Sequence, residues 1–194
     1  MYQPLKTSPD VTPNVKRLVQ HLDMLLGDVH SMMRLPLQDE GLTHGCNFAA
    51  AVVLLELIGG VSATLFQGSG GSGQRYKDLL RGYYPWDAEG ETKPGGAARE
   101  LYKFWRNPLA HELGISGKKG GIGKGGGLPE ELVEKLELSP TPPSRTLQII
   151  PTEDMMHLSV EALYWGTRTM VQRLLNDAKM LKKAEGYLKK KLKA

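Results

Sequence analysis

The sequence predicts an all-α fold, a bundle of about four to five main helices with a glycine- and lysine-rich loop and one short strand or hairpin inserted. Apolar residues recur at helical spacing in residues 13–34 and again after residue 152. Residues 46–66 are apolar on nearly every side, as in a helix that other helices surround. Only residues 146–150 have the composition of a strand. A single strand cannot form the core of a sheet, so helices must supply the core.

The first expected helix follows Thr12 and Pro13 and runs to about Arg34. Threonine is a common N-cap and proline suits the first helical position, so the two together mark a helix start. The apolar residues that follow form one stripe: Val15, Leu18, Val19, Leu22, Leu25, Leu26 and Val29. This helix is therefore expected to be amphipathic, with one face in the core.

Residues 46–66 form the expected central helix. A bilayer needs about 20 apolar residues, so residues 48–66 must also be considered as a membrane span. Glu56 and the Gly59-Gly60 pair interrupt this run, and a charge inside a membrane is costly. We therefore expect a helix buried among other helices.

Shorter elements follow the central helix. Glycine and serine fill residues 68–73, which we expect to form a flexible turn because glycine disfavours a helix. Short helices are expected over residues 74–81 and 97–105, where apolar side chains return at helical spacing. Residues 114–127 contain eight glycines and three lysines, which predicts a mobile loop.

The C-terminal third is expected to return to helix after one interruption. A brief helix is predicted over residues 129–138, and residues 139–151 are expected to be irregular except for the strand at 146–150. Thr152 is then expected to cap one long helix that continues past Leu175 toward the C-terminal tail.

The chain divides into one domain, residues 1–178, and a basic C-terminal helical tail, residues 179–194. The tail holds seven lysines and one glutamate, a net +6 within a total of +4, which leaves −2 for the other 178 residues. Apolar residues recur at helical spacing in the tail, so we expect a helix with a lysine face. Such a face could contact phosphates or an acidic membrane, or it could be a solvated helix end.

Composition and short motifs limit the compartment and the cofactors. The single cysteine, Cys46, can form no intramolecular disulfide, and no signal peptide is recognisable, so we expect a cytoplasmic protein. Cys46 and His44 are too few for a zinc site. Residues 121–126 fit G-x-G-x-x-G, but they follow a polar loop instead of a strand. The sequence thus predicts no cofactor and no metal.

Residues 106–111 (Arg-Asn-Pro-Leu-Ala-His) are the segment that could carry out chemistry. Asn107 and His111 lie four residues apart on one helix face, and Pro108 bends the chain so that Arg106 can join them. An imidazole with a pKa near 6.5 can take a proton from a ribose 2′-hydroxyl or give one to a leaving oxygen. A guanidinium can stabilise the charge on the phosphate. This set suits metal-independent cleavage of RNA.

The same residues also fit a purely structural role. In that alternative, Asn107 caps a helix, Arg106 pairs with a carboxylate such as a buried Glu56, and His111 fills a packed corner. The arginine-to-histidine spacing alone is too common to exclude it.

The motif, placed after an amphipathic helix and a strongly apolar one, resembles the HEPN domain superfamily over residues 12–178. The resemblance implies a HEPN-like helical bundle that forms a homodimer through its motif helices, with two arginine–histidine pairs facing one cleft. Many members are metal-independent endoribonucleases, often toxins or defence effectors that an antitoxin or other protein partner neutralises. By this resemblance Arg106 stabilises the phosphate, Asn107 is the polar residue that follows it, and His111 is the catalytic imidazole.

Two functions therefore remain open. The first is an endoribonuclease that cleaves RNA at a dimer cleft. The second is a non-catalytic HEPN-like dimer that binds a partner protein or nucleic acid, since some members keep the fold without cleaving anything. A third, membrane association through residues 48–66 and the basic tail, is expected least.

Overall fold

The computed structural model describes residues 2–34, 47–87, 94–106, 136–139, 150–152 and 155–192. Its helices are α1 (Pro13–Met32), α2 (Asn47–Thr64), α3 (Ser72–Tyr83), α4 (Pro94–Glu100), the π-helix η1 (Leu101–Arg106), α7 (Val160–Leu175) and α8 (Ala178–Lys191). Its strands are β1 (Leu136–Ser139), β2 (Ile150–Thr152) and β3 (Met155–Ser159). The predicted helical architecture is confirmed.

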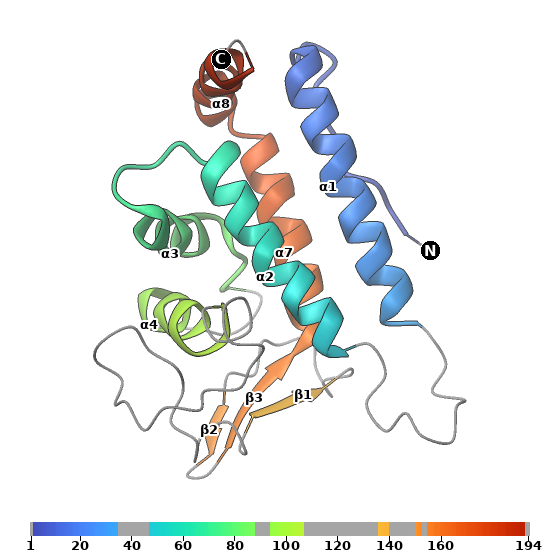
Figure 1. Cartoon of the computed structure of the whole chain (residues 1–194), viewed down its shortest axis with the longest axis vertical. Helices are drawn as coiled ribbons and strands as arrows, with labels where there is room; N and C mark the ends of the chain where they lie inside the picture. Colours follow the sequence, from blue (N-terminus) through green and yellow to red (C-terminus); the bar gives the residue numbers. More distant parts are fainter. Residues whose placement is uncertain are drawn as a thin grey trace.

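Helix α2 lies at the centre of the bundle. It contacts α1, α3, α7, α8 and η1, and Figure 1 shows α1, α2 and α7 running lengthwise through the molecule. Because neighbours surround α2, its side chains are buried on several faces, including Leu54, Leu55 and Ile58. The predicted central helix is confirmed over Asn47–Thr64. Among the helices that the structure describes, none is both long and apolar enough to cross a bilayer.

Helix α1 begins at Pro13, as predicted, and buries part of its apolar stripe. Val15, Val19, Leu22, Leu26 and Val29 are buried in the core. Burial of one such side chain stabilises the fold by about 1.5–3 kcal/mol. The stripe is wider than the buried face, however, because Leu25 keeps 40% of its surface exposed.

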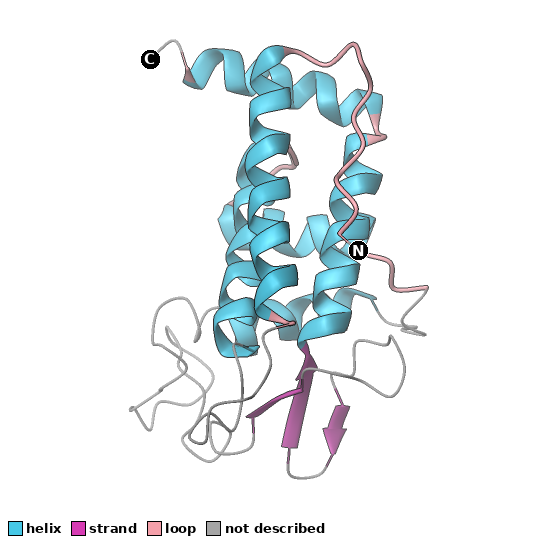
Figure 2. Cartoon of the chain, turned by 90° about the vertical axis from the view of Figure 1, so that its right-hand side faces the viewer, coloured by secondary structure: helices cyan, strands magenta, loops and turns pink. Residues whose placement is uncertain are grey.

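A small sheet lies at one end of the helices (Figure 2). The strand order is β1-β3-β2, in which β3 pairs in parallel with β1 and antiparallel with β2. Three strands are more than the single strand or hairpin that the sequence predicted.

The strands correct two sequence predictions. The predicted strand at 146–150 agrees with β2 at Ile150, and its residues 146–149 lie outside the described residues. Leu136–Leu138, expected to end a helix, belong to β1. Thr152 is part of β2 and caps no helix, since β3 intervenes before α7 begins at Val160. Periodicity cannot separate a short apolar run in a strand from one in a helix, and the partner of β1 lies twenty residues away in the sequence.

The predicted long C-terminal helix is two helices. α7 ends at Leu175, and Asp177 then caps α8 by accepting a hydrogen bond from the backbone N–H of Met180 at 3.0 Å. The same carboxylate accepts a hydrogen bond from the Tyr83 hydroxyl at 2.6 Å, which fixes the corner against α3. Ala184 and Leu188 of α8 are buried in the main hydrophobic core, so the basic tail packs on the bundle.

Gly166 in α7 is a position where a side chain is expected to destabilise the fold. A Cβ there would overlap the ring and hydroxyl of Tyr84, which is buried and donates a hydrogen bond to the Ala162 carbonyl at 3.3 Å. We expect Gly166→Ala to lower the free energy of unfolding by about 1–3 kcal/mol, measured by urea denaturation. Gly186→Ala is the matched control, because no heavy atom lies within 4 Å of its Cβ, and it should be neutral or stabilise α8. Equal effects of the two substitutions would contradict this packing.

His30 is expected to make stability fall in mild acid. Its ring lies between those of Tyr2 and Tyr164, with centroids 5.8 and 5.7 Å away. Burial, followed by the nearby charge of Arg34, lowers the pKa of His30, so the neutral ring favours the folded state. The contribution is complete above the unfolded pKa near 6.5 and is lost as the pH falls below it.

The measurement compares urea denaturation of wild type and His30→Phe between neutral and mildly acidic pH. Besides Arg34, the charged groups around Tyr2 and Tyr164 are Asp23 and Arg168, and both are unchanged in the variant. The variant should lose less stability in acid than wild type does. Parallel curves would show that His30 does not cause the decrease.

Candidate functional site

Arg106 is the one predicted site residue that the structure places. It is the last residue of η1, so the chain passes directly from this helix into the rest of the motif. Asn107 and His111 lie outside the described residues, as does the loop at 114–127. The structure therefore shows the position of the first residue of the motif. That the side chains of Arg106, Asn107 and His111 converge stays a prediction.

An ion pair joins Arg106 to Glu56 on α2. The guanidinium Nε lies 3.4 Å from Oε1 of the carboxylate. This is the pairing expected if Arg106 is structural, but Glu56 is not the buried partner that the sequence suggested, because its side chain is 47% exposed. The Arg106 side chain is 20% exposed and its Nε is buried, so solvent reaches the pair from the Glu56 side, and exposed pairs contribute about 0–1 kcal/mol.

Two tyrosines lie beside this ion pair. The Arg106 guanidinium carbon is 6.0 Å from the ring centroid of Tyr102, and the rings of Tyr102 and Tyr76 are 5.3 Å apart. On α3, Lys77 places its ammonium nitrogen 5.9 Å from the same Tyr102 ring. Both cations are near the limit of a cation–π contact, and the charge of Arg106 is offset by its pair with Glu56.

Tyr76 lies beneath the surface at this place. It is buried, and within the described part of the chain its hydroxyl has no hydrogen-bond partner. Burial raises the pKa of Tyr76, and the charges of Arg106 and Glu56 act on it in opposite directions. Its hydroxyl therefore stays protonated at neutral pH and remains a hydrogen-bond donor.

The arrangement can bind an anion at the surface of the bundle. Arg106 carries a permanent charge, its planar group matches the geometry of a phosphate, and one carboxylate holds it from the side of α2. The sequence indicated Glu56 only as a structural partner of Arg106. Its special position was visible in the sequence, because Glu56 is the single charged residue in the apolar run 48–66. Tyr76 and Tyr102 were missed, since nothing in their spacing indicates a site.

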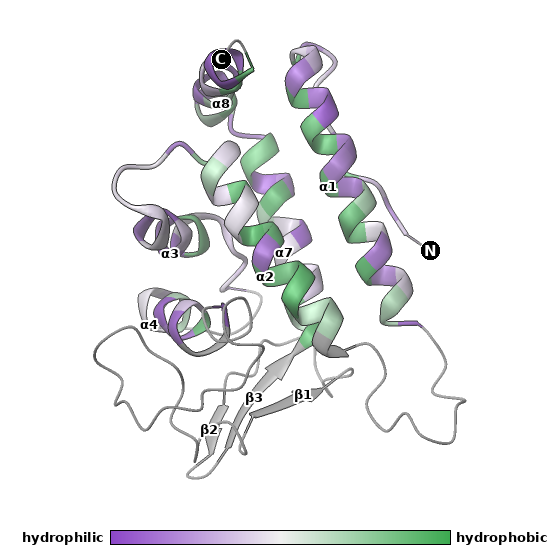
Figure 3. Cartoon of the chain, viewed as in Figure 1, coloured by the Kyte–Doolittle hydropathy of each residue, from purple (hydrophilic) through white to green (hydrophobic). Residues whose placement is uncertain are grey.

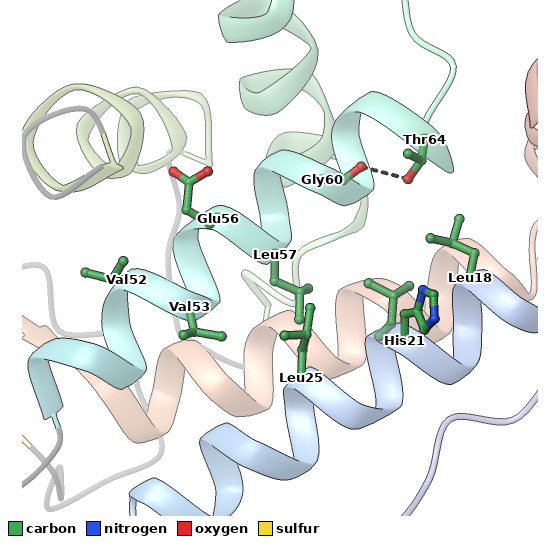
Figure 4. A pocket seen from close by; sticks show the side chains of 10 residues that line it. Leu18, His21, Leu25, Val52, Val53, Glu56, Leu57, Gly60 and Thr64 are labelled. Atoms are coloured by element: carbon green, nitrogen blue, oxygen red, sulfur yellow. Dashed lines mark hydrogen bonds between the residues drawn. The ribbon is translucent and has the colours of Figure 1, made fainter. Parts of the chain in front are cut away.

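A second candidate site is an apolar groove of about 450 Å³ between α1 and α2. Its lining consists of Leu18, His21, Leu22, Leu25, Val52, Val53, Glu56, Leu57, Gly60 and Thr64. Figure 4 shows Leu25 and Leu57 pointing toward each other across the groove, while the Glu56 carboxylate points away from it. The Thr64 hydroxyl donates a hydrogen bond to the Gly60 carbonyl at 2.7 Å, so it is already satisfied. The groove therefore suits an apolar group.

The described residues contain no group of three or more histidine, cysteine, aspartate or glutamate side chains that could hold a metal ion. His44 and Cys46, considered above as a metal pair, lie outside the described residues. Comparisons with protein-family models, with curated proteins and with solved structures find no match to this chain.

Proposed function

We propose that this chain is a HEPN-like, metal-independent endoribonuclease that acts as a homodimer, with Arg106, Asn107 and His111 in its active site. The observation that carries the proposal is the position of Arg106 at the end of η1. There a permanent cation keeps 20% of its side chain exposed and is held by Glu56. The helical core in which α1 and α2 precede the motif agrees with the resemblance described above.

The chemistry follows from the residue types. His111 of one copy takes the proton of a ribose 2′-hydroxyl, whose oxygen then attacks the adjacent phosphorus. The bond from phosphorus to the 5′-oxygen breaks, and the histidine of the second copy gives that oxygen a proton. Arg106 stabilises the negative charge that builds on the non-bridging oxygens. The products are a 2′,3′-cyclic phosphate and a 5′-hydroxyl, so no water or metal is consumed.

The experiment is an RNA cleavage assay with the purified protein in excess EDTA. We expect single-stranded RNA to be cut and the fragments to carry cyclic phosphate and 5′-hydroxyl ends. RNA that stays intact, or that is cut only after a divalent metal is added, would contradict the proposal. A toxin or defence role would further require that an expressed partner suppress the cleavage.

The groove between α1 and α2 favours a second candidate function, a non-catalytic helical dimer or partner-binding protein. Leu25 on its rim is 40% exposed and could be covered by an apolar helix of a second copy. In this case Arg106 and Glu56 only stabilise the fold.

Leu25→Arg tests this second function. If the groove is the dimer contact, the substitution places a charge in it and should raise the dimer dissociation constant by at least about tenfold, measured by light scattering. Met24→Arg is the matched control, since Met24 is 65% exposed and does not line the groove. A dimer unaffected by Leu25→Arg would exclude the groove as its contact.

A further inference from the structure

The outer face of α8 is a dense and exposed positive surface. Six lysines of this helix are exposed: Lys179, Lys182, Lys183, Lys189, Lys190 and Lys191. From the first to the last they extend over roughly 18 Å at the rise of an α-helix. Within the described ranges no ion pair involves any of them, and only Lys191 approaches an aromatic ring, that of Tyr187 at 5.8 Å.

The one acidic residue of α8 is directed toward α1. The carboxylate of Glu185 accepts a hydrogen bond from the backbone N–H of Thr12 at 3.1 Å, so it is directed to the start of α1. This contact also places α8 beside the first turns of α1, where Lys16 and Arg17 are exposed. Figure 1 shows α8 at the end of the bundle where α1 begins, and Figure 3 colours much of it as hydrophilic.

The apolar face of α8 is already used. Ala184 and Leu188 are buried in the main core, and Met180, Leu181 and Tyr187 pack against it. An amphipathic helix binds a membrane by inserting its apolar face roughly 5–10 Å into the interface, which α8 could do only by leaving the bundle. The exposed large apolar side chain nearest to these lysines is that of Leu192, the residue that follows the last residue of α8. The structure thus leaves the lysines free for electrostatic contacts and keeps the apolar face from lipid.

We infer that the lysine face of α8 binds the phosphate backbone of RNA, as a docking surface separate from the motif at Arg106. The choice of RNA rests on the proposed function, and the charge complementarity rests on α8 itself. A row of ammonium groups on one helix face contacts successive phosphates without reading the bases. α8 contacts α2, whose C-terminal residue Thr64 lies eight residues, or roughly 12 Å, beyond Glu56. To reach Arg106, an RNA strand held by α8 would extend along the bundle in the direction of α2.

The test measures RNA binding in a protein that cannot cut. In the His111→Ala background, Lys182, Lys183, Lys189 and Lys190 are changed together to glutamine, and binding of a labelled oligouridine is followed by fluorescence anisotropy. We expect at least about tenfold weaker binding at 100 mM salt. The plot of the logarithm of the association constant against the logarithm of the salt concentration should become less steep, by up to about 3 in slope. Arginine at the same four positions retains the charge and should retain the affinity, and the melting temperature should not change in either variant.

Equal affinity of the glutamine variant and its parent would overturn the inference. The inference would also be overturned if the parent protein bound phosphatidylserine vesicles through these lysines and did not bind oligouridine. The two proposals fail separately. A wild type that never cuts but binds oligouridine through these lysines contradicts only the ribonuclease, and one that cuts while the glutamine variant binds normally contradicts only the docking surface.

Discussion

His111→Ala is expected to reduce the rate of RNA cleavage by about 10²–10⁴-fold, the usual contribution of a positioned general acid or base. The expected loss lies toward the larger value, because in a symmetric dimer the substitution removes both the base and the acid. The measurement is single-turnover cleavage of a labelled single-stranded RNA in EDTA, with protein in excess, so that binding does not limit the rate.

The control is a histidine outside the motif. His21 is exposed and lines the groove between α1 and α2, so His21→Ala should cleave RNA at the wild-type rate. Both variants should keep the wild-type circular dichroism spectrum and dimer mass. If His111→Ala cuts as fast as wild type, the imidazole is not catalytic. If wild type never cuts RNA and His111→Ala lowers the melting temperature, the structural role of the motif is favoured.

The helices that could be predicted are those whose signals are local. Pro13 and the stripe behind it mark the start and the buried face of α1, and the unbroken apolar run marks α2. These predictions agree with the structure because each depends only on residues that are close together in the sequence. The α2 run even indicates its position, since a helix apolar on every side must lie among other helices.

Most of the wrong predictions concern strands, whose pairing with other segments decides the structure. β3 pairs with β1 twenty residues upstream and with β2, in which Thr152 lies opposite Met155. These pairings override the helix that Thr152 and the acidic residues after it suggested. The break between α7 and α8 was local and could have been found, because Asp177 is a common N-cap residue.

The site was predictable only in part because contacts between distant residues form it. Arg106 could be named from its motif, and Glu56 from its isolation in an apolar run, but the fold brings them together across fifty residues of chain. No pattern predicts that the Tyr102 ring lies between α3 and the end of η1, or that the Tyr76 hydroxyl is buried below. These positions depend on how α3 packs against α2.

Arg106→Ala is expected to reduce cleavage by about 10²–10³-fold, the typical cost of removing one group that stabilises charge in the transition state. The fold should be nearly unaffected. The lost ion pair with Glu56 is open to solvent on the carboxylate side, and solvent-exposed pairs contribute at most about 1 kcal/mol. Cleavage and thermal melting of the same preparations measure the two effects. Arg106→Lys keeps the charge but loses the planar fork, so its cleavage rate should fall between those of wild type and Arg106→Ala.

Glu56→Gln separates a positioning role of the carboxylate from a structural one. The substitution keeps the shape and removes the charge that holds Arg106, so cleavage should fall by at most about fivefold, the equivalent of about 1 kcal/mol. If Glu56 acts only by placing the guanidinium, Glu56→Gln should change nothing further in the Arg106→Ala background. An equal loss in both backgrounds would show that Glu56 acts on the substrate or on His111 directly. Large and equal losses of stability for Arg106→Ala and Glu56→Gln, without any cleavage to lose, would instead assign the pair to the scaffold.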